Sequence, residues 1–310
     1  MSAEFVLPTP KVPAREAQFV RYSHQQLDGS WIIVDVSVDE WRQFQRPSTR
    51  SICRKRPSGC LIRDLQNGSS FITWVENVDV RDKTEALHPK LTPFVESGYA
   101  FGARRWISNL QTFATPHTTT GRHQTKPERR AWRSRPTSEG VILAKPPGLH
   151  RTAGCTIELL SSHNRVFDYL RDIQNRPQWE RISTNSIVQE LATFNTGPDP
   201  RNCISVLGIS RHNDLLLLQE CSTDETGSFV IFAPIEKADF QSLLCGVDQE
   251  IQLMPFGFYI LPNVSGSILD GTLLTMVFQI TVKNVSKKKA VEVATQIVKE
   301  TLHKIIEAVN

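Results

Sequence analysis

The 310-residue sequence has no apolar run long enough to cross a membrane as a helix. The longest candidate, residues 271–282, has 12 residues and includes Gln279 and three threonines, whereas a spanning helix needs about 18 or more apolar residues. The N-terminal segment also lacks the basic stretch and apolar core of a secretory signal. We therefore expect an intracellular protein without a membrane span.

Metal-binding and catalytic motifs are missing as well. None of the six cysteines forms a C-x-x-C pair and no matching histidine pair accompanies them, so free thiols are expected rather than a zinc site. The sequence contains no G-x-S-x-G, P-loop, H-E-x-x-H or G-x-G-x-x-G motif. Neither His163 nor His303 has a cysteine or serine at nucleophile spacing. We predict that the chain is not an enzyme and holds no cofactor or metal.

The net charge of +4 conceals a local excess of basic residues. Residues 112–154 contain eight lysines and arginines against two glutamates, together with five prolines, many threonines and no apolar periodicity. This composition is typical of a linker. A basic linker can be a solvated tether or can hold phosphates through its charge, and we favour the tether.

Strand and helix patterns follow the same order on both sides of this linker. The first block has β-branched strand patterns at residues 29–36, 60–62 and 71–78, with a hairpin signal at Asn67-Gly68. A period of three to four residues then predicts one long helix from Leu87 to Leu110. In the second block, we predict a helix at 165–175, followed by four strands at residues 215–220, 227–232, 257–261 and 271–282. A terminal helix is predicted at 290–309.

Matching residues also recur in the two blocks. Gly29-Ser30-Trp31 aligns with Gly227-Ser228-Phe229 at an offset of 198 residues, as does Pro57-Ser58-Gly59 with Pro255-Phe256-Gly257. Trp74 aligns with Phe278 at an offset of 204. The repeated order favours a duplicated unit. We predict an α+β helix-grip fold, in which a curved antiparallel sheet packs on a long C-terminal helix and leaves a cavity between them.

Alternation along the last strand of each block predicts the cavity lining, because every second residue of a strand shares a face. The predicted lining residues are Ile72, Trp74, Glu76 and Val78 in the first block and Leu274, Met276, Phe278 and Ile280 in the second. A carboxylate among apolar side chains is costly unless it is paired. Glu76 is therefore either a polar handle for a ligand head group or the partner of an arginine such as Arg63. Trp179 is predicted to be a core anchor at the edge of the second sheet.

Longer segments carry a family resemblance. Three of them resemble the end of the START lipid-binding domain of plant class IV homeodomain–leucine zipper transcription factors: RKRPSGCLIRDLQNG (54–68), TWVENVDV (73–80) and VESGYAFGARRWISNLQ (95–111). Four others resemble the START-adjacent domain of the same family: RVFDYLRDIQNRPQWE (165–180), NCISVLGIS (202–210), LLLLQECSTDETGSFVIFAPI (215–235) and LMPFGFYILP (253–262).

The resemblance implies a domain plan and a ligand. Residues 1–111 would be the C-terminal part of a START domain, present as a partial unit, 112–154 the basic linker, and 155–310 the more complete START-adjacent, START-like domain. The family's W-F-x-N recognition helix and leucine heptads have no counterpart here, so no sequence-specific DNA binding is expected. The implied partner is a hydrophobic small molecule of lipid or sterol type. The implied location is the nucleus, with the cytoplasm as the alternative.

Two functions remain open at this point. One is a lipid- or sterol-binding module of a transcription regulator that senses a ligand or acts through protein partners. The other is a structural or dimerising remnant without a functional cavity. The strand region 18–36 would leave an open sheet edge, and open edges promote association. We therefore expect this edge to pair with the second domain or with another copy of the chain.

Overall fold

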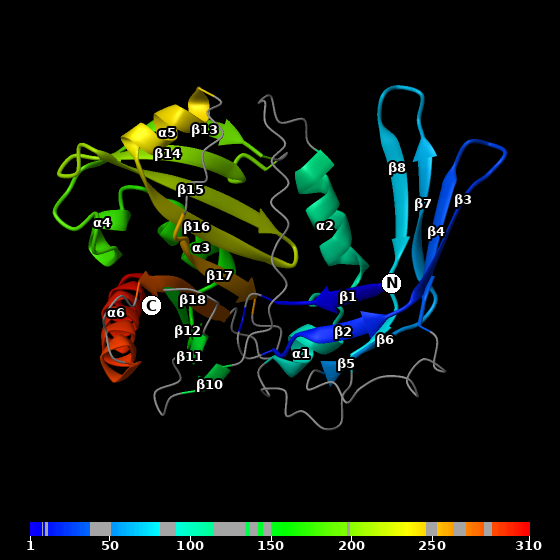
Figure 1. Ribbon diagram of the computed structural model, residues 1–310, viewed down its shortest axis with the longest axis horizontal. Coiled ribbons are helices and arrows are strands. Elements are labelled where there is room, and N and C mark those ends of the chain that lie inside the picture. The colour runs from blue at the N-terminus through cyan, green and yellow to red at the C-terminus, as the bar shows by residue number, and fades with distance from the viewer. Residues whose placement is uncertain are drawn as a thin grey trace. The chain divides into compact units, whose positions relative to one another are not determined.

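The computed structural model describes residues 1–7, 9, 12–37, 51–80, 91–114, 134–136, 142–144, 150–196, 199–245, 253–262, 271–281 and 287–310. The chain divides into two compact units, residues 1–110 and 111–310, whose elements are labelled in Figure 1. Both units combine antiparallel sheet with helices, as the sequence predicts, and each is described by itself.

The first unit is built around an antiparallel sheet with the strand order β3-β4-β7-β8. Its strands are β3 (Val20–Gln25), β4 (Trp31–Val36), β7 (Ser58–Asp64) and β8 (Ser70–Val75). The predicted strands are confirmed, and Gly68 lies in the β7–β8 turn with a φ of +82°, a conformation that glycine adopts without strain. Smaller pairings involve β1 (Ser2–Phe5), β2 (Arg15–Gln18), β5 (Ser51–Ile52), β6 (Arg54–Lys55) and β9 (Val78–Asp79).

The long helix predicted after this sheet is wrong in its described part. The chain instead forms α1 (Thr92–Glu96) and α2 (Ala103–Ala114), and residues 81–90 lie outside the described residues. Gly98 has a φ of +82°, and a left-handed glycine after the last helical turn ends a helix. A Cβ atom at Gly102 would lie 2.4 Å from the Gly98 carbonyl oxygen, so a glycine is needed for the tight turn between the two helices.

The second unit contains a nine-stranded antiparallel sheet with the order β10-β11-β12-β18-β17-β16-β15-β14-β13. Its strands are β10 (Ser134–Pro136), β11 (Ile142–Ala144), β12 (His150–Leu159), β13 (Val188–Asn195), β14 (Cys203–Ile209), β15 (Leu215–Asp224), β16 (Gly227–Glu236), β17 (Phe256–Pro262) and β18 (Thr272–Thr281). The sheet begins before residue 155, inside the segment expected to be a linker. Backbone pairing needs no apolar period, which is why composition did not reveal β10 and β11.

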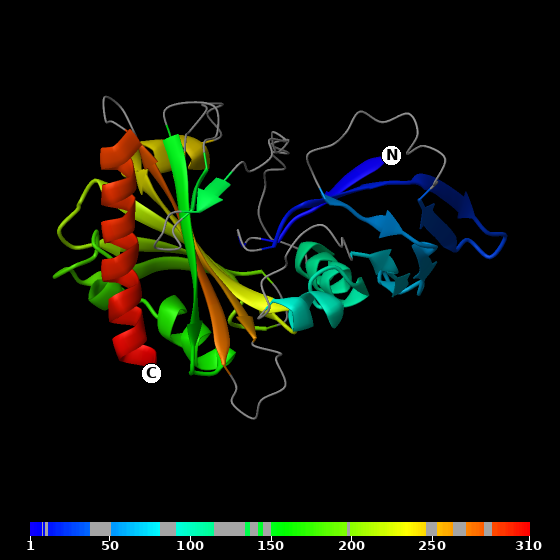
Figure 2. The ribbon, with the colours of Figure 1, turned by 90° about the horizontal axis from the view of Figure 1, so that it is seen from below.

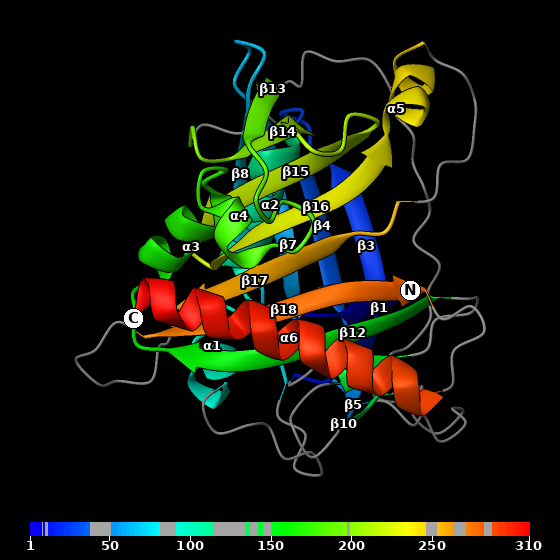
Figure 3. The same cartoon turned by 90° about the vertical axis from the view of Figure 1, so that its left-hand side faces the viewer.

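Helices cover one face of this sheet. The terminal helix α6 (Lys287–Val309) lies along the face in Figure 2 and crosses the strands in Figure 3, where it contacts β12 and β18. Next to it, α3 (His163–Arg171) packs on β16, β17 and β18, while α4 (Arg176–Trp179) packs on α6. This is the helix-grip arrangement. α5 (Lys237–Leu244) follows β16 and packs its Phe240 with Leu216 and Ile235 in a separate cluster on the other face of the sheet. Local spacing predicts an apolar stripe along α6 that starts at Val291. Its later members are buried, and Val291 is half-buried; the buried residues are Ala294, Val298, Leu302, Ile305 and Val309.

Strand order supports the duplication, but the predicted alignment of the last strand is wrong. The order β3-β4-β7-β8 matches β15-β16-β17-β18. Gly59 lies opposite Val75, and the aligned Gly257 lies opposite Val277. By this register Trp74 corresponds to Met276 and not to Phe278, because the loops before β8 and β18 differ in length. The slip is two residues, so each side chain keeps its predicted face.

Candidate functional site

The predicted lining residues of β18 face the terminal helix. Leu274, Met276 and Phe278 are buried and belong to one core cluster with the apolar stripe of α6. The side chain of Ile280 lies outside the described residues, although its backbone pairs with Arg151 of β12. Phe278 and Phe256 have parallel rings with centroids 6.2 Å apart. The space between β18 and α6 is thus lined by apolar side chains.

Trp179 anchors the helical layer on the middle of the sheet. Its side chain is 1% exposed, and its ring meets Phe232 and Phe258 edge-on at centroid distances of 5.8 and 5.3 Å. The packing role predicted for Trp179 is confirmed. Its predicted place at the sheet edge is wrong, because Phe232 and Phe258 belong to β16 and β17, which lie inside the nine-stranded order.

A buried cation lies beside Trp179, which sequence analysis did not identify. The guanidinium of Arg176 is 4.3 Å from the ring centroid of Phe232 and 5.0 Å from that of Trp179. Its Nη1 lies 3.1 Å from Oε2 of Glu180, one helical turn later, and its Nη2 donates a hydrogen bond to Gln219 of β15. A buried charge must be paired and hydrogen-bonded to be tolerated, and these partners meet part of that requirement.

Several polar atoms around Arg176 remain without hydrogen-bond partners among the described residues. Apart from Nη1 of Arg176, which is held by its ion pair with Glu180, they are Nε of Arg176, Nε1 of Trp179 and Oε1 of Glu180, all of which are shielded from solvent. A buried donor or acceptor that lacks a partner costs about 1–3 kcal/mol. Two donors and one acceptor are therefore available at this point of the apolar core. The sequence spacing is compatible with an ion pair between Arg176 and Glu180, since residues four apart share a helix face. It does not indicate that this ion pair is buried.

In the first unit, the predicted residue Glu76 is paired with a different partner from the one we named. Its Oε1 lies 3.2 Å from Nζ of Lys55, and its Oε2 accepts a hydrogen bond of 3.0 Å from the indole of Trp74. Arg63 does not make this ion pair, because Lys55 already occupies the position next to the buried carboxylate. Trp74 itself stacks on Trp106 of α2, with ring centroids 5.9 Å apart. Glu76 is thus held within the unit by side chains on both oxygens.

Lys55 extends this ion pair into a larger buried network. Its Nζ also lies 2.9 Å from Oδ2 of Asp35. Arg21 donates one hydrogen bond to each oxygen of this carboxylate, from Nε to Oδ1 at 2.7 Å and from Nη2 to Oδ2 at 2.8 Å. Burial alone would raise the pKa of Asp35, but the hydrogen bonds from Arg21 and Lys55 outweigh it and hold the pKa below its usual value. Two carboxylates and two cations are therefore fixed on the inner side of the small sheet.

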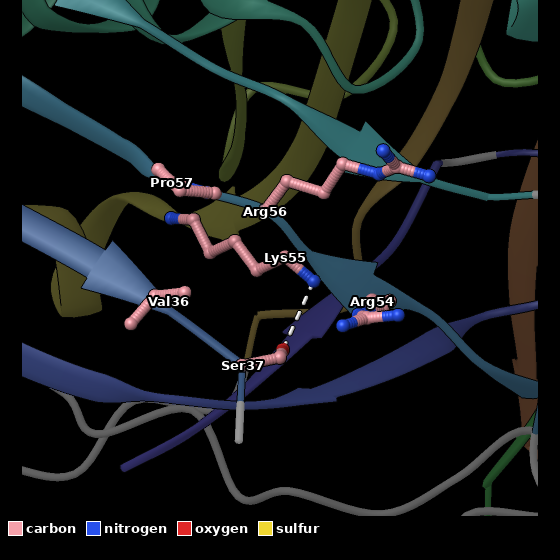
Figure 4. Close-up of a pocket in the computed structure, with 6 residues that line it drawn as sticks. All are labelled: Val36, Ser37, Arg54, Lys55, Arg56 and Pro57. Atoms are coloured by element: carbon pink, nitrogen blue, oxygen red, sulfur yellow. Dashed lines mark hydrogen bonds between the residues drawn. The ribbon is translucent and has the colours of Figure 1, made fainter. Parts of the chain in front are cut away.

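A small pocket of about 230 Å³ opens beside this network (Figure 4). Its lining residues are Val36, Ser37, Arg54, Lys55, Arg56 and Pro57. The backbone N–H of Lys55 donates to Oγ of Ser37 across it at 3.0 Å. None of the predicted lining residues Ile72, Trp74, Glu76 and Val78 belongs to it. Because three of the six lining residues are cationic, the pocket does not suit an apolar molecule.

His163 has a partner that sequence spacing could not show. Its Nε2 and Oγ of Ser228 are 2.7 Å apart, although 65 positions separate the two residues in the chain. Ser228 is in turn hydrogen-bonded to Thr223. Burial lowers the pKa of His163, and the charge of Arg201 adds to this effect. The contact fixes the first residue of α3 to β16.

Two other kinds of site were searched for in the described part of the chain. It contains no group of three or more His, Cys, Asp or Glu side chains placed to hold a metal ion. Within the same residues, no helix has the length and apolar content needed to cross a membrane.

Comparison with known proteins gives two family matches. The family model of the PDF2-like C-terminal domain matches residues 107–310, and that of the START domain matches residues 1–115. Similar curated proteins include homeobox-leucine zipper protein HDG11 of Arabidopsis thaliana, which is 32% identical, with 97% of this chain and 50% of the relative covered. Protein ROC8 of Oryza sativa subsp. japonica is 35% identical, with 85% and 43% covered. The chain thus spans half or less of the length of these relatives.

Two human proteins are among the solved structures with a similar fold. STARD10 has a TM-score of 0.35 and 14% identity, with 57% of this chain and 72% of that chain covered. The lipid transfer and protein localization domain of StarD13 has a TM-score of 0.39 and 12% identity, with 59% and 90% covered.

Proposed function

This chain belongs to the family of plant class IV homeodomain–leucine zipper proteins, and on that basis we propose that its second unit binds an apolar ligand of lipid or sterol type. The START-domain match, which stands for the lipid-binding module of this family, covers residues 1–115, and the second unit, which matches the PDF2-like C-terminal domain, carries the larger sheet with the long terminal helix. The observation that carries the proposal is the apolar layer between β18 and α6, formed by Leu274, Met276 and Phe278 against the helix stripe. A ligand would enter by taking the place of contacts in this layer.

The polar cluster at Arg176 supports a ligand that has one polar group. Arg176 Nε and Trp179 Nε1 are donors, and Glu180 Oε1 is an acceptor. A hydroxyl group both donates and accepts hydrogen bonds, so it can match this combination, whereas a hydrocarbon leaves all three atoms unpaired. A sterol-type alcohol therefore fits the site better than an unsubstituted hydrocarbon.

The role of this binding is regulatory in our proposal. A ligand held under α6 would stabilise the closed grip by mass action, and the chain would pass this state to partner proteins in the nucleus. The activity needs no catalytic residue and no DNA contact by the described residues. The first unit, whose inner side carries the Asp35–Lys55–Glu76 network, would serve as a structural and interaction module.

Ligand retention in the purified chain tests the proposal. After delipidation, the chain is loaded with a sterol that has a free hydroxyl, and bound ligand is counted by native mass spectrometry. Phe278→Trp and Met276→Trp should abolish retention because they fill the layer, while Gln279→Ala should leave it unchanged. Equal recovery from all three variants, with folding verified by circular dichroism, would contradict the assigned position.

A finer variant addresses the polar group. Trp179→Phe keeps an aromatic ring in the core but removes the indole N–H, whose hydrogen bond should contribute about 1 kcal/mol. We expect the affinity for the sterol to fall several-fold, with no change for the matching hydrocarbon without the hydroxyl. A loss of the same size for both ligands would indicate a packing effect and contradict the polar contact.

A second candidate function is dimerisation through β3. All six residues of this strand are exposed, and in the described part of the chain β3 pairs only with β4. An exposed strand edge presents backbone groups to another chain. If β3 of a second copy paired with this strand so that the two Tyr22 residues lay opposite each other, the sheet would be extended and each side chain would stay on its own face. Tyr22→Lys should then convert a dimer to a monomer in sedimentation velocity, whereas a wild-type monomer would exclude this function.

A further inference from the structure

Two cysteines of the second unit lie directly opposite each other on neighbouring strands. Cys203 at the start of β14 pairs with Cys221 of β15 in the antiparallel register. Residues in this relation share a face of the sheet and have Cα atoms about 4.5 or 5.5 Å apart. Disulfides span Cα distances of about 4.4–6.8 Å, so these two residues can be linked without movement of the strands.

The two thiols share one environment. Both side chains are buried in the core cluster beneath the helices. Hydrogen bonding to Cys221 lowers the pKa of Cys203, and the reciprocal interaction together with burial raises the pKa of Cys221. Because a thiolate is the nucleophile in disulfide exchange, Cys203 is the sulfur that reacts first.

The remaining cysteines show no comparable arrangement in the described strand pairings. Cys155 lies opposite Met276, and Cys60 lies opposite Ile33 and Trp74. Cys53 is buried, and burial raises the pKa of its thiol to about 11. All six cysteines are free thiols in this structure. The geometry for a disulfide is therefore specific to Cys203 and Cys221.

We propose that Cys203 and Cys221 form a reversible disulfide between β14 and β15, with a small-molecule disulfide such as oxidised glutathione as the oxidant. The Cys203 thiolate attacks one sulfur of the oxidant, and one glutathione thiolate leaves and takes up a proton. The Cys221 thiol then loses its proton and attacks the sulfur of Cys203, which releases the second glutathione. Two protein thiols are oxidised, and one disulfide is reduced to two thiols.

The surroundings of the pair give this link a structural effect. Gln219, two residues before Cys221 and therefore on the same face of β15, accepts the hydrogen bond from Arg176. Arg171 and Arg176 are both close enough to lower the pKa of Cys221 in part. Oxidation would fix β14 to β15 next to the buried cation and replace two thiols with an apolar link. The proposal does not depend on ligand binding, since it rests on the strand register and on the burial of both cysteines in one core cluster.

Oxidation of the full reduced chain tests the proposal. The chain is incubated with mixtures of oxidised and reduced glutathione, quenched with an alkylating reagent and analysed by intact mass and peptide mapping. We expect loss of two hydrogens, a single linked peptide pair containing Cys203 and Cys221, and reversal by reductant. Detection of both residues only as alkylated thiols under oxidising mixtures would overturn the proposal.

Variants separate the two sulfurs. Cys221→Ser should trap one glutathione on Cys203, because no second thiol is present to release it, and Cys203→Ser should prevent the modification. Cys155→Ser is the matched control, since Cys155 is buried in the same core cluster, and the link should still form in this variant. Formation of an intramolecular disulfide by Cys203 in Cys221→Ser would contradict the pairing. If a variant does not fold, peptide mapping of the oxidised wild-type chain is sufficient to show whether Cys203 and Cys221 are linked.

Discussion

The two units arrange their corresponding strands in the same order but differ in what those strands carry beneath the helices. In the first unit, Asp35, Lys55 and Glu76 form buried ion pairs. In the second, the last strand presents Leu274, Met276 and Phe278 to α6. Strand order is maintained by backbone pairing, which does not depend on side-chain polarity. The inner face is consequently free to differ, and only the apolar version suits a hydrophobic ligand.

The largest effect is expected from removal of the core anchor in the second unit. Trp179→Ala deletes a fully buried ring that meets Phe232 and Phe258, and should lower the free energy of unfolding by about 4 kcal/mol. Urea denaturation monitored by circular dichroism measures the change. Trp31→Ala is the control, because Trp31 is 44% exposed and should cost far less. Similar costs for both variants would contradict the anchoring role.

A smaller loss of stability is expected when the buried ion-pair network of the first unit is broken. Asp35→Asn removes the buried partner of Lys55 and Arg21, and breaking such a pair costs about 3 kcal/mol because a buried charge loses its compensation. Replacing Asp35, Lys55 and Glu76 together by Leu, Met and Gln should recover part of this loss, because no buried charge is then left without its partner. Urea denaturation with hydrogen exchange of β4 and β7 measures both. A triple variant less stable than Asp35→Asn would contradict the explanation.

The same network predicts sensitivity to acid. The pKa of Asp35 is lower in the folded chain than its unfolded value of about 4. Its contribution to stability is therefore complete above about pH 4 and is lost as the pH falls through the lower folded-state value. In Asp35→Asn, this part of the acid dependence should disappear.

The smallest effect concerns His163. Burial lowers the pKa of this residue, so the unfolded chain takes up a proton at a higher pH than the folded chain does. The stability of the second unit should fall as the pH drops below the unfolded-state pKa of about 6.5. Denaturation midpoints from pH 7 to pH 5 measure this, and His163→Gln should flatten the dependence. An equally steep dependence in the variant would assign the effect to other groups.

Periodic features of the sequence predicted much of the fold. The apolar stripe of α6 depends on local spacing and is confirmed by burial, whereas burial does not separate the two faces of β18, because Leu273 and Thr275 are as buried as Leu274 and Met276. The break between α1 and α2 was missed because apolar residues keep their period across Gly98, although a glycine at that place is also a helix-end signal. The apolar pattern predicted which helix face is buried, but it did not predict the residue at which the backbone adopts a left-handed conformation and the helix ends.

The candidate site was less predictable because it depends on contacts between distant segments. The alternation put Glu76 on one face of its strand with Trp74, but its partner Lys55 lies on another strand. The burial of Arg176 follows from its position between Trp179 and Phe232, which belong to a helix and a strand far apart in the sequence. Local patterns indicate which side chains are apolar, whereas the pairing of buried charges is decided by tertiary packing.

The pairing of β12 with β18 has a consequence for how the protein is made. Ten residue pairs join residues 150–159 to residues 272–281, so β12 leaves the ribosome well before its partner has been synthesised. Until then β12 has an open edge on that side, and such edges in incomplete chains promote aggregation. Completion of the second sheet must follow translation of the C-terminal strand. A premature stop before residue 272 would therefore yield a product for disposal by the quality-control machinery, not a shorter working domain.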